Sequence, residues 1–279
     1  MATESEINSL FDFIIPLAER AGDILREGYS SQKEITSKGA YDMVTNYDHQ
    51  IENFLIKEIS AVYPNHKFIG EEESAARNVT TVLTNDPTWI IDPIDGTSNF
   101  IKQLGNTCVS IGLSINKDVV LGVVVNPILS ETYTAKKNQG AFLNGKQIKV
   151  SDCEKIADAT IGYEVSLLHC EDIKAKHIKR IYALASKSTR TLSYSSVVLA
   201  LCYVARGSFD GYHIEDMFPW DVAAGMLIIR EAGGFIMNPL GGEVDIMKPS
   251  LVCAGRESLC QEIVSLIQEA DQMKGINFD

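Results

Sequence analysis

Apolar residues near the start of the chain recur every three or four positions, the spacing of one face of a helix. Thr3 and Glu6 precede this run at the spacing of a capping box, so we expect a helix to begin there. Pro16 interrupts the pattern and could kink the helix. A polar, glycine-bearing loop follows, and a second amphipathic helix is predicted to begin near Thr45 and to end at Pro64.

After this second helix, the apolar residues occur in short runs, many of them β-branched, between turn-forming residues. KFIG and TWIID are predicted strands. Two longer runs, CVSIGLSIN and VVLGVVVNP, are separated by Lys117 and Asp118, which suggests a hairpin. Further strands are expected in ETYTAKKN, QIKVSD and DATIGYEV.

The last part of the chain mixes helices and strands. EDIKAKHIKRIYALAS is amphipathic, whereas SSVVLALCYVARG is apolar nearly all round and stops at Gly207, which is typical of a buried helix. WDVAAGMLIIREAGG and ESLCQEIVSLIQEA are predicted helices, and SFDGYHI and SLVCAG are predicted strands. No repeat or low-complexity linker divides the chain, so we predict a layered α/β fold in a single domain, residues 1–279.

The composition is ordinary for a soluble globular protein, with 45% hydrophobic and 22% charged residues. A formal net charge of −12 argues against non-specific nucleic-acid binding, which requires a basic face. The 6 cysteines form no CxxC motif and no zinc-like spacing with histidine, so we interpret them as buried free thiols in a reducing compartment. Neither a signal-like N-terminus nor an apolar run of roughly 20 residues occurs, so we expect a cytoplasmic protein without a membrane partner.

The stretch IIDPIDGTSNF contains the first candidate chemistry. Asp92 directly follows a predicted buried strand, and Pro93 restricts it to extended geometry, so that Asp92 and Asp95 can face the same point. Gly96 allows the backbone to approach a ligand closely, and a helix or turn that begins at Thr97 would present N–H groups to an anion. The alternative is a turn that uses Asp and Gly for conformational reasons alone.

Other acidic residues also stand at predicted element ends. Glu71–Glu73 follow a strand and a glycine, where they form either a cation site or a solvated face. Asp221 stands at a predicted helix start, where an acid also complements the helix dipole. Asp48 lies three residues after Thr45, where it could act as a capping-box acid.

Taken together, these acids predict a metal site. Carboxylate clusters without cysteine or histidine favour hard, oxygen-preferring cations, and therefore Mg²⁺ over Zn²⁺. Mg²⁺ commonly binds together with substrate phosphates. Two such ions roughly 3.5–4 Å apart can stabilise both the attacking and the leaving oxygen of an in-line displacement.

An ordered set of motifs resembles the inositol monophosphatase family: DMVTNYD, FIGEEES, WIIDPIDGTSNF, GAFLNG and WDVAAGMLIIREAGG. The resemblance covers roughly residues 7–270. It implies alternating layers of helices and sheets, a homodimer, and lithium-sensitive, Mg²⁺-dependent hydrolysis of small phosphomonoesters. It also implies a metal-binding N-terminal half of about residues 1–150 and an α/β C-terminal half of about residues 151–279.

The resemblance also implies a ligand set for two or three Mg²⁺ ions. Glu71 matches a metal ligand, Asp92 matches the acid that bridges two metals, and Ile94 matches a ligand through its backbone carbonyl. Asp95 and the distant Asp221 match the ligands of the second metal.

The implied catalytic residues are Glu71, Asp48 and Thr97. The Thr97 hydroxyl matches the group that, with Asp48, orients and helps deprotonate the attacking water, so no serine or cysteine nucleophile is needed. The amides of Gly96 and Thr97 would hold the phosphate. Lys38 could approach the same region, or it could be an ordinary solvated lysine.

The substrate side departs from the family pattern. Members that take inositol phosphate carry Gly-x-Ala-Ala before the apolar helix, whereas this chain has SYSS, with Ser193 and Ser195 as candidate substrate-binding residues. Those members also carry a glutamate six residues before the WD tryptophan. Ile214 stands at that position here, and a one-residue shift would place Glu215 there instead.

Three functions remain open at this point. The first is hydrolysis of inositol monophosphate. The second is the same chemistry on another small phosphate, such as a nucleotide, a sugar phosphate or a bisphosphate. The third is a catalytically silent scaffold, because a fold alone does not establish activity. The aromatic pair Phe218 and Trp220 could line the site or belong to the core.

Overall fold

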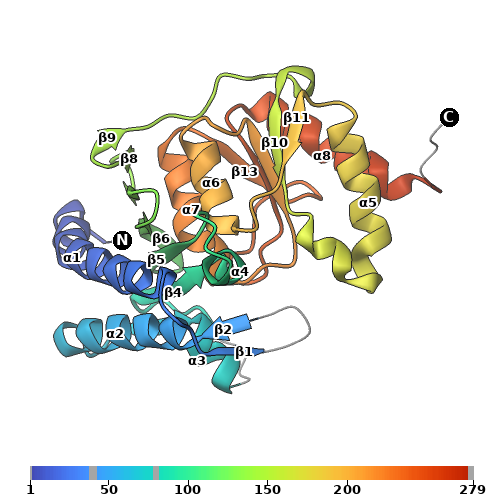
Figure 1. The fold of residues 1–279 in the computed structure, drawn as a ribbon. Helices are drawn as coiled ribbons and strands as arrows, with labels where there is room; N and C mark the ends of the chain where they lie inside the picture. Colours follow the sequence, from blue (N-terminus) through green and yellow to red (C-terminus); the bar gives the residue numbers. More distant parts are fainter. Residues whose placement is uncertain (1, 38–42, 78–81, 276–279) are drawn as a thin grey trace.

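The computed structural model describes residues 2–37, 43–77 and 82–275. Helices and sheets alternate as layers across the molecule (Figure 1). Helices α1 (Glu4–Tyr29) and α2 (Asn46–Val62) cover one face of a seven-stranded sheet. The other face packs on α6 (Val197–Ala205) and α7 (Pro219–Glu231), which in turn pack on a five-stranded sheet. Helices α5 (Glu171–Ala185) and α8 (Glu257–Gln272) back that sheet. The predicted layered α/β fold is confirmed.

The seven-stranded sheet contains the longest strands and follows the order of the sequence from β3 to β9. Its first pair is parallel and the others are antiparallel. The strands are β3 (Lys67–Gly70), β4 (Thr88–Asp95), β5 (Cys108–Ile115), β6 (Asp118–Asn126), β7 (Glu131–Lys136), β8 (Ala141–Leu143) and β9 (Lys146–Gln147).

The five-stranded sheet has the order β11-β10-β12-β14-β13. Its first three strands run parallel, so their C-terminal ends meet at one edge. Its strands are β10 (Thr160–Tyr163), β11 (Arg190–Leu192), β12 (Gly211–Ile214), β13 (Phe235–Met237) and β14 (Leu251–Ala254). A separate antiparallel pair precedes α2 and consists of β1 (Ile35–Ser37) and β2 (Met43–Thr45).

The remaining helices include the four that were predicted in the second half of the chain. They are α5 (Glu171–Ala185), the fully buried α6 (Val197–Ala205), α7 (Pro219–Glu231) and α8 (Glu257–Gln272). The sequence patterns did not predict the short helix α3 (Glu71–Arg77) or the 3-10 turns η1 (Ile156–Asp158) and η2 (Ser166–His169). The short helix α4 (Thr97–Ile101) begins at the residue where a helix or turn was considered.

The alternation of side chains along the central strands assigns their residues to different layers. Trp89 and Ile91 of β4 pack under α1 and α2, whereas Ile90 belongs to the cluster around α6 and α7. Helix α7 can lie close to the sheet because Gly112 has no side chain. A Cβ at this position would stand only 3.0 Å from the Cβ of Ala223. This close approach brings the start of α7 towards the end of β4.

Several local predictions are confirmed. The Thr3 capping box is formed at the start of α1, and the helix continues through Pro16 without a break. Thr45 is the N-cap of α2, which ends two residues before Pro64. All six cysteines are free, four of them buried.

Two details differ from the predictions. The hairpin turn lies at Asn116 and Lys117, which both have positive φ, and Asp118 already begins β6. Such a turn matches the twist of the flanking strands. In QIKVSD only Gln147 belongs to a strand, because the chain then leaves the sheet and the amide of Val150 bonds to the carbonyl of Ala232.

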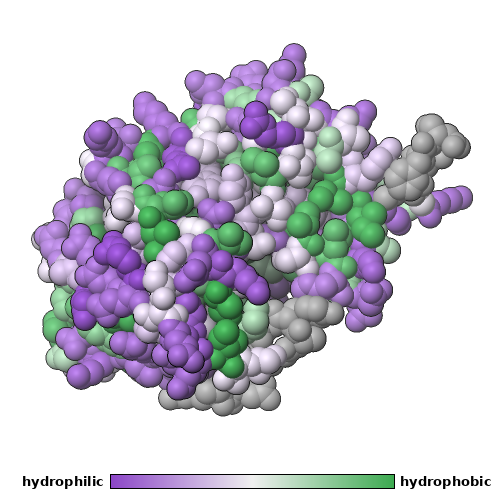
Figure 2. All heavy atoms as spheres, in the orientation of Figure 1, coloured by the Kyte–Doolittle hydropathy of each residue, from purple (hydrophilic) through white to green (hydrophobic). Residues whose placement is uncertain are grey.

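Figure 2 shows hydrophilic residues over most of one face, with hydrophobic residues in smaller groups, one of them over the region of α5. The exposed apolar residues of that region are Val165, Ile178 and Tyr182. Within the described part of the chain, every helix is too short or too polar to cross a bilayer.

Candidate metal centre

The centre of the site is the C-terminal end of β4. The pairing of β4 with β5 shifts register between Asp92 and Asp95, where Pro93 cannot donate to the ladder. Asp92, Asp95 and Asp221 each bring one carboxylate oxygen into a cluster whose oxygens all lie within 4.8 Å of one another. A hard divalent cation fits such an oxygen-only cluster.

Asp48 and Asp221 lie at the starts of helices α2 and α7. Asp48 Oδ2 accepts hydrogen bonds from the amide of Thr45 (2.8 Å) and from its hydroxyl (2.5 Å). Asp221 Oδ2 accepts from the amide of Phe218 at 2.8 Å. Each acid therefore caps its helix, the role that the sequence left open as the alternative to a metal site. The caps also fix the position of both carboxylates near Asp92.

Glu71 is the first residue of α3, directly after β3. The start of that helix is held by Glu52, whose carboxylate accepts from the amides of Glu72 (3.0 Å) and Glu73 (2.7 Å). Burial raises the pKa of Glu52 to about 7, although these two amides favour its ionised form. Glu52 thus fixes the backbone that presents Glu71.

The electrostatics show that the acids converge on Asp92. Burial raises the pKa of Asp92 well above its usual range, and the charges of Glu71, Asp95, Asp221 and Asp48 raise it further. Asp92 Oδ1 is buried and has no hydrogen-bond partner among the described residues. A divalent cation would give this buried oxygen a partner and would offset the repulsion between the carboxylates, so the residues present fit such a metal.

Asp95 is held on its other side by the C-terminal half of the chain. Its Oδ1 accepts from the amide of Val197 at 3.2 Å, and its Oδ2 accepts a short hydrogen bond from the Ser196 hydroxyl. Burial raises the pKa of Asp95, while these donors oppose that rise. The site is therefore completed by residues about a hundred positions further along the chain.

Thr97 and Gly96 follow immediately. Thr97 Oγ1 donates to the carbonyl of Ile94 at 2.9 Å and lies 3.5 Å from Asp48 Oδ1. Gly96 has a φ of 77°, and a Cβ there would stand 2.7 Å from the carbonyl oxygen of Asn106. Only glycine suits this position, because a side chain would meet both backbone strain and backbone atoms.

Ser193 and Ser195 lie at the C-terminal edge of the five-stranded sheet, where Glu164 engages both. Glu164 Oε1 accepts from the Ser193 hydroxyl at 3.2 Å, and Oε2 accepts from the Ser195 amide at 3.0 Å. On the other side, Asn99 Nδ2 donates to the carbonyls of Tyr194 (2.8 Å) and Ser195 (3.1 Å). The structure therefore joins this loop to the metal centre.

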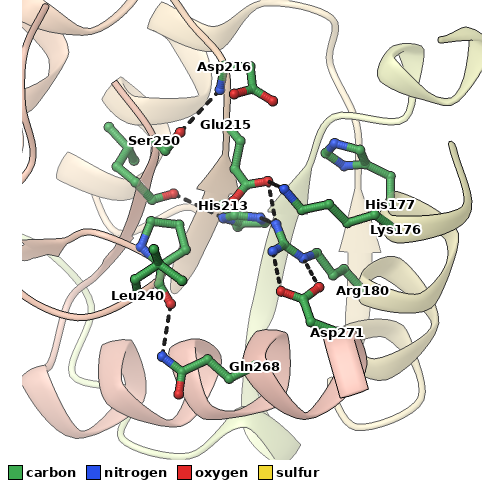
Figure 3. A network of polar contacts seen from close by, with 12 residues as sticks. Lys176, His177, Arg180, His213, Glu215, Asp216, Leu240, Ser250, Gln268 and Asp271 are labelled. Carbon is green, nitrogen blue, oxygen red and sulfur yellow. Dashed lines mark hydrogen bonds and ion pairs between the residues drawn. The ribbon is translucent and has the colours of Figure 1, made fainter. Parts of the chain in front are cut away.

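Glu215 stands at the end of β12 but belongs to a buried ionic network (Figure 3). Its carboxylate contacts Lys176 Nζ at 2.6 Å and forms a shorter ion pair with Arg180. The guanidinium of Arg180, only 2% exposed, also pairs with Asp271 of α8 at 2.5 Å. Burial alone would raise the pKa of Glu215, but the hydrogen bond from Arg180 is the main cause of its fall to about 2.

The structure thus brings Asp92, Asp95 and Asp221 into one cluster, and the charges of Glu71 and Asp48 also act on Asp92. The Glu215 carboxylate instead pairs with Arg180 and Lys176. Sequence reasoning missed Glu52, Glu164 and Asn99. No local signal could have revealed their role, since the bonds that connect them to the site span 20 or more residues of sequence. Lys38 lies outside the described residues.

The layered fold and the carboxylate cluster define a class of α/β proteins built to hold hard cations at a strand end. A profile described as the inositol monophosphatase family matches residues 6–272. Inositol monophosphatase 2 from Solanum lycopersicum is 44% identical over 236 residues, which cover 84% of this chain and 89% of the relative. This chain belongs to the inositol monophosphatase family.

Solved structures agree with this assignment. The suhB protein from Bartonella henselae superposes with a TM-score of 0.85 at 27% identity, covering 96% of this chain and 100% of that one. SaIMPase-II has been solved with inositol monophosphate bound (TM-score 0.79, 26% identity, 94% of this chain and 96% of that one). The same protein has been solved with 2'AMP bound (TM-score 0.78, 28% identity, 95% and 98%).

Proposed function

We propose that this protein hydrolyses inositol monophosphate to inositol and phosphate with Mg²⁺ as its cofactor. The observation that carries the proposal is the cluster of buried Asp92 and Asp95 with half-buried Asp221 in a member of this family. Inositol monophosphate bound to the related SaIMPase-II supports the choice of substrate.

The ligands that we propose for two or three Mg²⁺ ions are Glu71, Asp92, the Ile94 carbonyl, Asp95 and Asp221. All are oxygen donors, as Mg²⁺ prefers. When bound, the ions would neutralise charge on the phosphate and the leaving oxygen and would polarise the attacking water.

The protein's own part in the reaction is to orient the water and take its proton. Thr97 Oγ1 lies between the Ile94 carbonyl and Asp48 Oδ1, at 2.9 Å and 3.5 Å. We propose that the hydroxyl orients the water and passes a proton towards Asp48. The helix cap holds Asp48 through Oδ2, which directs Oδ1 towards Thr97. We count Glu71 with these catalytic residues because its charge acts on Asp92.

The phosphate would bind at the amides of Gly96 and Thr97, where the glycine leaves the backbone accessible. Ser193, Ser195 and Glu215 remain our proposed residues for the alcohol side. Glu164 holds the Ser193 hydroxyl and the Ser195 backbone amide, and Arg180 and Lys176 hold the Glu215 carboxylate, so substrate would meet an edge that is already ordered.

Further proposals rest on family membership and on the thiols. We propose a homodimer, sensitivity to lithium, and a cytoplasmic location, the last because all six cysteines are free. We also propose one domain with its metal-binding half before about residue 150, because the Asp95 contacts cross between the halves. Light scattering and LiCl inhibition of hydrolysis test the first two.

The decisive experiment compares Asp92→Asn with Asp12→Asn, a control at an exposed acid of α1. Phosphate release from inositol 1-phosphate in MgCl₂ should fall roughly 1,000-fold in Asp92→Asn, since a misplaced metal loses several kcal/mol of charge stabilisation. Asp12→Asn should match the parent protein. Absence of hydrolysis by the parent protein in MgCl₂ contradicts the proposal.

A second substrate class has a specific observation in its favour, namely 2'AMP bound to SaIMPase-II. A panel of inositol 1-phosphate, 2'AMP, a sugar phosphate and a bisphosphate, each at the same Mg²⁺ concentration, separates the two. A higher kcat/KM for 2'AMP than for inositol 1-phosphate would transfer the proposal to nucleotides.

A further inference from the structure

Glu164 is a buried carboxylate at the end of β10 that bonds only neutral groups among its described partners. It is 5% exposed. Its oxygens accept from the Ser193 hydroxyl at 3.2 Å, the Ser195 amide at 3.0 Å and the Ser166 amide at 2.9 Å. A desolvated carboxylate held by three donors is a strong, directional anchor.

The segment that Glu164 anchors, Ser193–Ser196, has a strained backbone. Ser195 has a φ of 52°, which lies in the left-handed region that non-glycine residues rarely adopt. Such a conformation persists only where surrounding contacts enforce it. Two hydrogen bonds hold Ser195. Its backbone amide donates to Glu164 Oε2, and its carbonyl accepts from Asn99 Nδ2 at 3.1 Å.

The far side of the same segment holds a proposed metal ligand. The Ser196 hydroxyl donates to Asp95 Oδ2, and the amide of Val197 donates to Asp95 Oδ1 at 3.2 Å. Ser196 is also the N-cap of α6, where its hydroxyl accepts from Leu199. The orientation of the Asp95 carboxylate therefore depends on where this segment lies.

We propose that Glu164 is a positioning residue that sets the affinity of the metal centre without touching metal or substrate. It holds Ser193–Ser196 against Asp95, so that both Asp95 oxygens keep a fixed direction. The inference rests on the proposed function in one respect, the binding of Mg²⁺ at Asp95. Partners that orient a ligand typically change metal affinity 10- to 100-fold when they are removed.

The chain offers a matched control at the opposite end of β10. Asp210 Oδ2 accepts from the amide of Thr160 at 2.6 Å, so it anchors the start of the strand as Glu164 anchors its end. Asp210→Asn removes a comparable carboxylate–amide bond away from the metal centre. It should lower stability while leaving the Mg²⁺ affinity within 2-fold of the parent protein's.

The test measures Mg²⁺ binding without substrate, from the rise of the melting temperature with MgCl₂ concentration. Glu164→Gln should raise the Mg²⁺ dissociation constant about 10-fold. It should shift the Mg²⁺ dependence of hydrolysis by the same factor, with a near-parent rate at saturating Mg²⁺. Glu164→Asp, whose shorter side chain keeps the charge but retracts the carboxylate, provides the same readout if the glutamine variant does not fold.

Ser196→Ala tests the route of the effect. If Glu164 acts through this segment, Glu164→Gln combined with Ser196→Ala should weaken Mg²⁺ binding by less than the product of the two single effects. Independent, multiplying effects would overturn the proposed route. A Glu164 variant that folds and binds Mg²⁺ within 2-fold of the parent protein would overturn the proposal itself, as would an equal loss in Asp210→Asn.

Failure of the proposed function gives a different result. A parent protein that binds Mg²⁺ but hydrolyses no inositol phosphate removes the substrate assignment and leaves the binding comparison intact. A parent protein whose melting temperature does not respond to MgCl₂ overturns both.

Discussion

The ionic network around Arg180 supports a quantitative prediction. Arg180 and Glu215 are both almost fully buried, with 2% and 7% of their side chains exposed. The Glu215 pKa falls from 4.5 to about 2 on folding. Since each pKa unit corresponds to about 1.4 kcal/mol, ionised Glu215 contributes about 3 kcal/mol to stability at neutral pH.

Arg180→Met removes the main partner of Glu215 and leaves a buried carboxylate with Lys176 alone. We expect it to lower the free energy of unfolding by about 3–5 kcal/mol, the usual cost of breaking a buried pair. The double variant Arg180→Met with Glu215→Leu should recover most of this loss, because no buried ion is then left without a partner. Asp271, which also loses Arg180, has 29% of its side chain exposed and can be hydrated. Urea unfolding followed by circular dichroism at pH 7 measures all three.

The pH dependence provides an independent check with a definite sign. The folded-state pKa of Glu215 lies below its unfolded value, so its contribution is present above about pH 4.5 and is lost as the pH falls towards 2. The stability difference between the parent protein and Glu215→Gln should shrink by about 1.4 kcal/mol between pH 7 and pH 3.5. A cost below about 1 kcal/mol for Arg180→Met, or a difference that does not change with pH, would refute the reasoning.

Two further predictions concern the metal centre. Gly96→Ala should lower the free energy of unfolding, measured in urea, by about 1–3 kcal/mol and should abolish hydrolysis. The reason is that Gly96 has a φ of 77° and that a Cβ would stand 2.7 Å from a backbone oxygen. Parent-like activity of this variant would contradict the prediction. The pKa of Glu52 is raised from 4.5 to about 7, so stability should fall by about 3 kcal/mol as the pH rises through this window. Glu52→Gln should flatten that part of the pH–stability curve, and an unchanged slope would contradict the assignment.

Local patterns predicted most of the long elements. The capping boxes at Thr3 and Thr45 fixed both helix starts, and the apolar run of α6 correctly indicated a fully buried helix. Such features depend on residues three or four positions apart, so they are legible in a sequence. The three-residue strands β1, β2, β8, β11 and β13 were missed, because three residues carry too little periodicity and depend on their neighbours in the sheet. Strand β1 lies in the segment that was predicted to be a polar loop.

The sequence alone also determined which acids to consider, since Asp92 and Asp95 flank a proline and precede a glycine within one motif. It left open whether Asp48 and Asp221 were helix caps or members of a site. The structure shows that they cap their helices and also lie near Asp92. A cap is a local bond, whereas convergence requires the packing of α2 and α7 on one sheet.

Only the tertiary structure decided what holds the site and what borders it. Glu52, Glu164 and Arg180 act on residues that are 20 or more positions away, and each does so as a buried charge. A buried charge must find its partners across the fold, and those partners are invisible to periodicity and propensity. The sequence by itself therefore determined most of the long elements and the candidate acids, and the packing of the layers determined their geometry and their supports.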